Sequence, residues 1–129
     1  MVAVDTNVLV RLVTNDNAAQ AARAAAIFRA GPVFIPKSVL LEAEWVLRFS
    51  YKLRTAAILR ALRAVLGLEN VAVEDPVTVV AALRFLESGL DFADALHVVS
   101  SSKAERFVTF DSRLVKRARS VTTVPVALA

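Results

Sequence analysis

Four carboxylates occupy positions from which they could bind a metal ion. Asp5 ends the apolar run "MVAV", and Asp111 follows a second apolar run, "FVTF". Asp94 lies three residues after Asp91 in "DFAD", a spacing that places both on one helix face. Glu42 lies inside the apolar segment "SVLLEAEWVLR". Clustered carboxylates repel one another unless a cation neutralises them, and oxygen ligands in a chain without cysteine suit Mg²⁺ or Mn²⁺.

Helical spacing distinguishes Glu42 from Glu44. Steps of three and four residues relate Glu42 to a stripe of apolar side chains, whereas Glu44 pairs at i,i+4 with Arg48. Burying an unpaired carboxylate costs several kcal/mol, so a buried Glu42 would need a cation. We therefore expect Glu42 to be buried in the apolar stripe and Glu44 to form an ordinary salt bridge on a solvated face.

Each aspartate also has a simpler explanation as a helix cap. Asp5 and Asp111 could be the N-caps of the helices that follow them. Asp91 could open a capping box with Asp94 near its third position. The carboxyl ends of parallel strands meet at one edge of a sheet, so Asp5, Asp111 and the helix that carries Asp94 should share that edge. Capping does not explain this common location or Glu42, whereas metal binding explains all four acids together.

Three neighbouring side chains, those of Asn7, Asp91 and Thr109, could assist the acids. Asn7 either supports the site or stabilises the turn after Asp5, and both roles remain open. Thr109 lies two residues before Asp111, so its hydroxyl could face the same edge of an alternating strand. His97 lies one turn after Asp94 within the apolar run "ALHVV". We expect His97 to be packed and hydrogen-bonded rather than to act as a ligand or base.

Short apolar runs alternate with helical patterns along the chain, and this alternation must position the acids. Buried strands are predicted at 2–4, 33–35, 71–73 and 107–110, with a weaker fifth strand at 121–126 that contains Pro125. Helices are predicted after Asp5 and at 18–30, 36–53, 55–66, 76–88, 91–104 and 111–120. The alternation predicts an α/β fold whose central, mostly parallel sheet of four to five strands is covered on both faces.

The composition fits one domain that spans residues 1–129, with 57% hydrophobic residues to build its core. No run of 18 apolar residues and no basic N-terminal region occur, so we expect neither a membrane span nor a signal peptide. The absence of cysteine is compatible with a reducing, cytoplasmic location. The net charge of +4 and an isoelectric point near 10.1 favour a polyanionic partner.

The order and spacing of four segments resemble those of PIN-domain ribonucleases, and more closely the VapC-type toxins of bacterial and archaeal toxin–antitoxin pairs. "VDTNVLVR" resembles the first motif, with Asp5 as its acid. "SVLLEAEWVLR" is similar to the second, whose glutamate precedes tryptophan by three residues and corresponds to Glu42. "DFADALHVV" resembles the third motif, with Asp94 as the principal acid. "FVTFDSRL" resembles the fourth, with Asp111 as its acid and Thr109 as an accessory hydroxyl.

The resemblance implies a three-layer α/β/α PIN fold, cleavage of RNA with Mg²⁺ or Mn²⁺, a homodimer and a cognate antitoxin protein. A divalent ion held by Asp5 and Asp94 would supply a Lewis acid and an activated water, with Asp111 and Glu42 completing the cluster. One departure is the segment "VVSSSKA", which carries serines where alanines are more usual. Basic side chains would either contact RNA phosphates or lie on solvated helix surface. The candidates are Arg11, Arg113, Lys116, Arg117 and Arg119.

Two other functions fit the sequence less well than a nuclease does. A phosphate-accepting receiver or phosphatase needs a second acid beside Asp5 and a lysine directly after "FVTF", and both are missing. A non-catalytic PIN-like module that binds RNA or a partner would have lost some of the acids, and none is lost. The surplus of apolar residues predicts a protein interface, for which helical residues 40–53 and 58–66 are the candidates.

Overall fold

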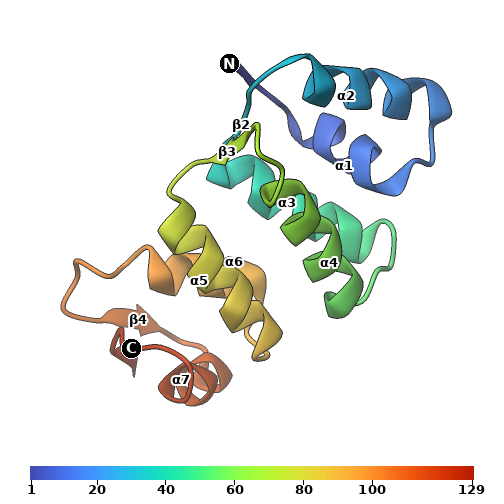
Figure 1. Cartoon of the computed structure of the whole chain (residues 1–129). Coiled ribbons are helices and arrows are strands. Elements are labelled where there is room, and N and C mark those ends of the chain that lie inside the picture. The colour runs from blue at the N-terminus through green and yellow to red at the C-terminus, as the bar shows by residue number, and fades with distance from the viewer. The chain divides into compact units, whose positions relative to one another are not determined.

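Strands and helices alternate along the whole chain, as the sequence pattern predicts (Figure 1). The computed structural model describes residues 1–129 and divides them into two units, Met1–Pro76 and Val77–Ala129. The single domain expected from the composition therefore stays a prediction. All strand pairs in both units are parallel, which confirms the α/β fold class.

The first unit contains three strands that pair in the order β1-β2-β3. Val2 pairs with Val33, and Val33 pairs with Val71. Parallel neighbours require crossover connections, which the helices between the strands provide. The elements are β1 (Val2–Ala3), α1 (Thr6–Thr14), α2 (Ala18–Ala30), β2 (Val33–Ile35), α3 (Lys37–Phe49), α4 (Thr55–Leu66) and β3 (Val71–Val73).

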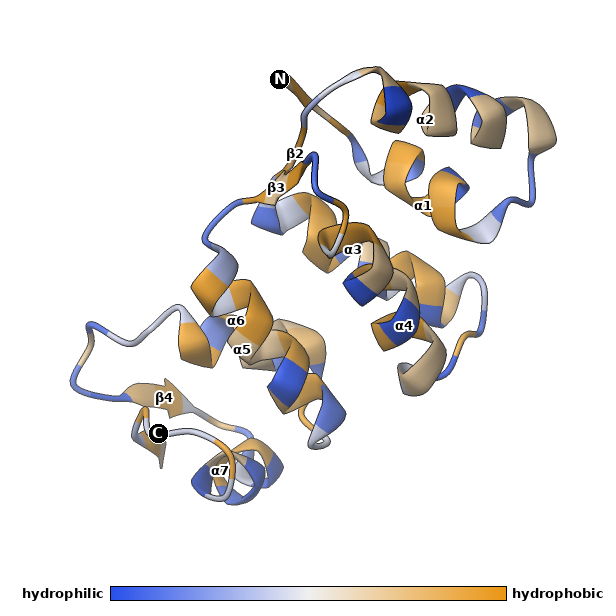
Figure 2. Ribbon diagram, viewed as in Figure 1, coloured by the Kyte–Doolittle hydropathy of each residue, from blue (hydrophilic) through white to orange (hydrophobic).

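The core of the first unit is built around β2, the middle strand of its sheet. Val33 and Ile35 are fully buried, and α1, α3 and α4 supply further buried apolar side chains. Apolar residues make up most of β2, β3 and α1 (Figure 2). Asn70, just before β3, donates from Nδ2 to the carbonyls of Phe28 (2.5 Å) and Gly31 (2.8 Å), and so fixes the end of α2 against the sheet.

The first strand differs from the sequence prediction. β1 has only two residues and both are exposed, Val2 with 52% of its surface accessible. It lies at one edge of the three-stranded sheet and pairs with β2 alone. An edge strand has one strand neighbour, so its apolar sequence does not ensure burial. The expectation of a buried first strand is therefore wrong for Val2 and Ala3, although Val4 is buried.

The second unit contains a two-stranded sheet, β4-β5, in which Phe107 pairs with Val126 and Thr109 with Leu128. The fifth strand begins after Pro125 rather than at Val121. Proline has no N–H, but the Pro125 carbonyl still accepts a hydrogen bond from the Phe107 nitrogen (2.7 Å). The elements are α5 (Pro76–Glu87), which begins at the last residue of the first unit, α6 (Phe92–Val99), β4 (Phe107–Thr109), α7 (Ser112–Arg119) and β5 (Val126–Leu128).

Most helices lie where the sequence predicts, but two end earlier. The helix predicted over 36–53 ends at Phe49, and that predicted over 91–104 ends at Val99. The first is followed by a turn in which Lys52 has a positive φ of 57°, a conformation that cannot continue a helix. No helix combines the length and apolar character that crossing a membrane requires.

Candidate active site

Asp5 is the N-cap of α1. Its backbone is extended, and its Oδ1 accepts a hydrogen bond from the Thr6 nitrogen (2.8 Å). The side chain is exposed, and the cap occupies only one of its two oxygens. The capping explanation and a role as metal ligand are therefore compatible, because the second oxygen remains available.

Thr6 connects the start of α1 to Glu42 on α3. The Thr6 side chain is buried, and its hydroxyl donates a hydrogen bond to Oε1 of Glu42. This contact fixes the Glu42 carboxylate beside the first turn of α1, directly after Asp5. Thr6 was not predicted from the sequence, although a small hydroxyl residue next to the first acid of a site is a recognisable signal.

The expected environments of Glu42 and Glu44 are both wrong. Glu42 is exposed, whereas Glu44 is buried with 4% of its surface accessible. The expected pair with Arg48 is present, since Nε of Arg48 lies 2.9 Å from Oε2 of Glu44, but Glu44 makes it from a buried position. The α3 helix carries apolar residues on several of its faces. Helical spacing alone therefore did not identify the face that packs inward. The candidacy of Glu42 therefore rests on its motif and on Thr6, and its burial does not support it.

Two acids of the second unit cap helices. Asp91 is the N-cap of α6 and accepts hydrogen bonds from the nitrogens of Ala93 (2.9 Å) and Asp94 (3.3 Å). The bond from the Asp94 nitrogen fixes the backbone of Asp94 in the first turn of α6, where Asp94 is half-buried. Asp91 is thus a helix cap, as its simpler explanation predicts, and the cap fixes the position of Asp94 while using only one of the two Asp91 oxygens.

Asp111 is the N-cap of α7 and accepts hydrogen bonds from the nitrogens of Arg113 (2.9 Å) and Leu114 (3.2 Å). The Asp111 nitrogen in turn donates to the hydroxyl of Thr109 (3.0 Å), so the accessory hydroxyl lies beside this acid. Phe110, between the two, has 90% of its surface accessible. Phe110 was not predicted from the sequence, although an aromatic residue between a strand and an acid is a recognisable signal.

The acids of the second unit interact electrostatically. Burial raises the pKa of Asp94 above its ordinary value, and the negative charges of Asp91 and Asp111 raise it further. His97 opposes this increase through its positive form. The expectation of a packed His97 is wrong, because its side chain is exposed on α6. A cation bound beside Asp94 would therefore stabilise the charged form of its carboxylate.

The donor chemistry of these residues fits a hard divalent cation. All candidate ligands are carboxylate oxygens, which Mg²⁺ and Mn²⁺ prefer, and Asp94 experiences repulsion that such an ion would relieve. Within either unit alone, no three acidic or histidine side chains are placed to bind one ion. The structure brings Asp5 and Glu42 together through Thr6 in the first unit, and Asp91, Asp94 and Asp111 in the second. A single cluster of all four principal acids stays a prediction.

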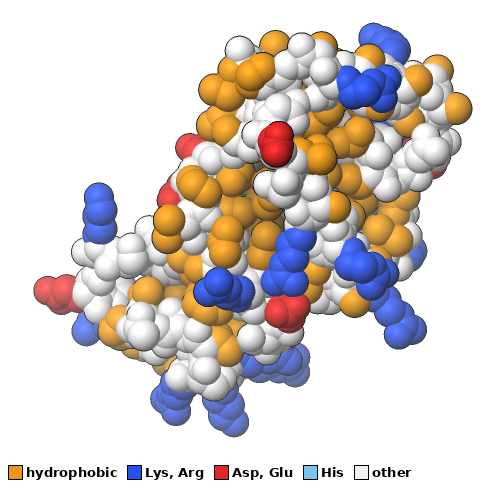
Figure 3. Space-filling model, in the orientation of Figure 1, with side chains coloured by type: hydrophobic (Ala, Val, Ile, Leu, Met, Phe, Trp, Pro, Cys, Tyr) orange, Lys and Arg blue, Asp and Glu red, His pale blue; other side chains and the backbone are white.

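The candidate RNA-binding residues differ in whether their side chains already make hydrogen bonds within the protein. Arg113 and Lys116 are exposed on α7, and Lys and Arg side chains gather around this helix (Figure 3). Arg117 donates from Nη1 to the carbonyl of Gly89 (2.9 Å). Arg11 uses its Nε and Nη1 for contacts within the first unit.

Asn7 is exposed and makes no side-chain hydrogen bond, so the structure gives no support to a turn-stabilising role.

One comparison with known proteins identifies the family of the chain. The PIN domain matches residues 2–120, a range that includes all four principal acids and every element from β1 to α7. No curated protein sequence gives a significant match to the chain. The match covers most of the 129 residues and agrees with the parallel α/β fold. The chain therefore belongs to the PIN domain family.

Proposed function

We propose that the protein is a metal-dependent endoribonuclease that hydrolyses phosphodiester bonds of RNA. Membership of the PIN domain family indicates a nuclease-type function, since PIN domains are generally nucleases. The observation that carries the proposal is the electrostatic state of Asp94. Burial raises its pKa, the charges of Asp91 and Asp111 raise it further, and acids that repel one another are stabilised when a cation binds.

In this proposal Asp5, Glu42, Asp94 and Asp111 are the catalytic acids and the ligands of Mg²⁺ or Mn²⁺. An ion bound by these residues would supply Lewis-acid stabilisation of the phosphate and would activate a water. The neighbouring side chains position the acids. Thr6 orients Glu42, Asp91 fixes the first turn of α6 below Asp94, and Thr109 accepts a hydrogen bond from the backbone of Asp111.

RNA binding is proposed for the surface around α7. Arg113 and Lys116 are exposed there and can contact phosphates. Phe110 is exposed directly before Asp111, and an exposed aromatic ring is a surface on which an unpaired base stacks. A cationic helix beside an exposed aromatic ring supports a single-stranded substrate.

We also propose that the protein is the toxin of a VapBC-type pair, acts in the cytoplasm, and forms a homodimer that binds a cognate antitoxin. The exposed rings of Trp45 and Phe49 support a protein interface on α3. Their centroids lie 5.2 Å apart, and 56% and 50% of their surfaces are accessible. They fall within residues 40–53, one of the two interface segments expected from the sequence.

RNA cleavage by the purified chain tests the nuclease. The expected result is cleavage with Mg²⁺ or Mn²⁺, none with EDTA, and a loss of at least about a hundredfold in kcat for Asp5→Asn and Asp94→Asn. Glu105→Gln is the matched control, because Glu105 is an exposed acid of the second unit outside the candidate site.

Three results would overturn this assignment. Cleavage that persists in EDTA would exclude a metal-dependent reaction. Normal cleavage by Asp5→Asn would remove that acid from the site. RNA binding without cleavage under any metal condition would favour the alternative function, a non-catalytic PIN-like module that binds RNA or a partner.

A further inference from the structure

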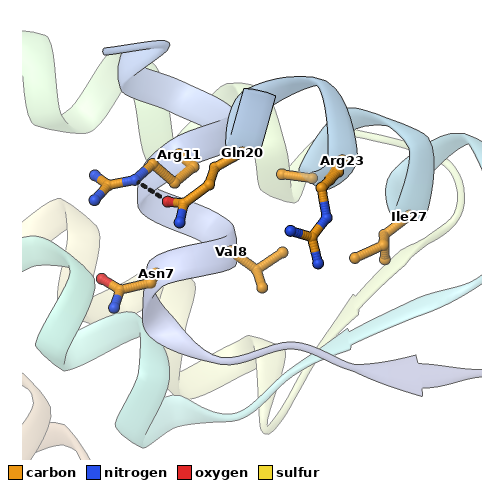
Figure 4. Close-up of a pocket in the computed structure, with 7 residues that line it drawn as sticks. Asn7, Val8, Arg11, Gln20, Arg23 and Ile27 are labelled. Carbon is orange, nitrogen blue, oxygen red and sulfur yellow. Dashed lines mark hydrogen bonds between the residues drawn. The ribbon is translucent and has the colours of Figure 1, made fainter. Parts of the chain in front are cut away.

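A cavity of about 200 Å³ lies between α1 and α2 of the first unit (Figure 4). Val8, Ala24 and Ile27 form its apolar part. Asn7, Gln20 and two arginines supply its polar part, and no acid lines it. Asn7 stands two residues after Asp5, so the cavity begins next to a proposed catalytic acid.

Arg11 is fixed at one side of the cavity. Its Nε donates to Oε1 of Gln20 (2.7 Å), and its Nη1 donates to the hydroxyl of Tyr51 (2.6 Å) and to Oδ1 of Asp16 (3.2 Å). Asp16 neutralises its charge. Because the oxygen of Gln20 accepts from Arg11, the remaining polar group of that side chain is its NH₂, which can only donate.

Arg23 differs from Arg11 because it makes no hydrogen bond or ion pair and is exposed. In Figure 4 its side chain extends toward Val8 and Ile27, on the cavity side of α2. The cavity therefore combines the donors of Gln20 and Arg23 with one positive charge that no carboxylate neutralises. Such a set suits an anionic ligand with several acceptor oxygens.

We propose that this cavity is a subsite for a backbone phosphate of the RNA substrate, with Arg23 as the phosphate contact. The inference rests on the proposed nuclease function and adds a part of the substrate path to it. RNA presents a phosphate at every nucleotide, and arginine binds phosphate through two parallel N–H donors. The apolar side chains beside Arg23 would cover the adjoining ribose. Since Asn7 and Asp5 belong to one segment, the phosphate belongs to a nucleotide close to the cleaved bond.

Charge-changing variants of the full chain test the subsite. Arg23→Gln removes the charge, and Gln20→Glu adds a carboxylate that can still accept from Arg11. Arg29→Gln is the matched control, because Arg29 is an exposed arginine of the same helix that does not line the cavity. Thermal unfolding of each variant shows whether it is folded.

Binding is measured by fluorescence anisotropy with a labelled, short, single-stranded RNA of mixed sequence, in EDTA so that the RNA is not cut. We expect Arg23→Gln to weaken binding about tenfold. It should also reduce the salt dependence, the slope of log K against log salt, by about 0.7, the value for one phosphate contact of a single strand. Gln20→Glu should weaken binding at least as much, and Arg29→Gln should leave the slope unchanged. With Mg²⁺, Arg23→Gln should raise KM more than it lowers kcat.

Equal affinities and slopes for Arg23→Gln and Arg29→Gln would overturn the subsite. Polyglutamate serves as a probe for a protein carboxylate. If Arg23→Gln lowered the affinity for polyglutamate while the affinity for RNA stayed unchanged, the cavity would belong to an acidic protein partner and the proposal would be wrong. Failure of the nuclease itself is distinguishable, since the wild-type chain would then not cleave RNA with either metal.

Discussion

The hydroxyl of Thr6 donates to the carboxylate of Glu42, which lies 36 residues further along the chain and on a different helix. Because Glu42 is otherwise exposed, this bond is what orients its carboxylate next to Asp5. Thr6→Val keeps the shape of the side chain but removes the donor. We expect about a tenfold decrease in kcat for RNA cleavage, and a loss of about 1 kcal/mol in the free energy of unfolding. Thr6→Ser retains the hydroxyl and is the control. Equal cleavage by the two variants would show that the bond has no catalytic role.

The raised pKa of Asp94 makes its charge unfavourable for folding. A carboxyl group with a higher pKa in the folded state binds its proton more tightly there, so stability falls as pH rises through this higher pKa. Asp94→Asn removes a charge that burial disfavours and that Asp91 and Asp111 repel, so it should raise the free energy of unfolding at pH 7, by about 0.5 kcal/mol for the like-charge part. The gain should disappear at about pH 3, below the ordinary aspartate pKa of about 3.9, where the group is protonated in both the folded and the unfolded state. Urea denaturation at both pH values measures it, and a gain independent of pH would contradict the electrostatic origin.

Metal binding should stabilise the folded chain. An ion that binds only the native state adds about 2.7 kcal/mol to the free energy of unfolding at a hundredfold excess over its Kd. Millimolar Mg²⁺ or Mn²⁺ should therefore raise the Tm of the wild type, and raise that of Asp94→Asn by less. Glu105→Gln should respond as the wild type does. The absence of a Tm increase at saturating metal would argue against a site formed in the folded protein.

Tyr51 should affect stability through Asp16. Its hydroxyl donates to Oδ2 of Asp16 (2.7 Å), and this bond is the main reason why the pKa of Asp16 is lowered. A lowered pKa gives stability that is present above the ordinary pKa of aspartate and is lost as pH falls through the lowered value. Tyr51→Phe should therefore lower the Tm at pH 7, and the difference should shrink at acid pH to the part that comes from the hydrogen bond with Arg11. In an Asp16→Asn background the pH-dependent part should be absent, and its persistence there would assign the effect to another group.

Asn70 should stabilise the first unit through its side-chain amide. Two carbonyls at the end of α2, those of Phe28 and Gly31, accept its hydrogen bonds. Asn70→Asp keeps the shape but has no N–H to donate, so we expect a loss of about 1–3 kcal/mol in the free energy of unfolding. Asn7→Asp is the control, because Asn7 makes no side-chain hydrogen bond. Equal urea midpoints for the two variants would contradict the role of Asn70.

Patterns within a few residues were predicted well from the sequence. The strand-to-helix positions of Asp5 and Asp111, and the cap at Asp91, depend on local signals, namely a short apolar run, a capping side chain and a helical pattern after it. Each proved to be a cap in the structure. The same local signals also predicted the parallel α/β fold.

Features that depend on distant neighbours were predicted poorly. Glu44 is buried and Glu42 exposed because the packing of α3, whose apolar residues occupy several sides, decides which face turns inward. The exposure of β1 depends on its edge position in the sheet. The contacts of Thr6 with Glu42 and of Arg11 with Tyr51 span 36 and 40 residues, and no local pattern encodes them.

Trp45 is the only tryptophan of the chain, and it lies on α3 three residues after Glu42. Residues at this spacing share a helix face, and the indole is more than half accessible to solvent. The emission of an indole shifts when water around it is replaced by protein, so its fluorescence reports on that face without any added label. A titration followed by this tryptophan emission would show whether a second chain, an antitoxin or RNA covers the side of α3 on which Glu42 lies.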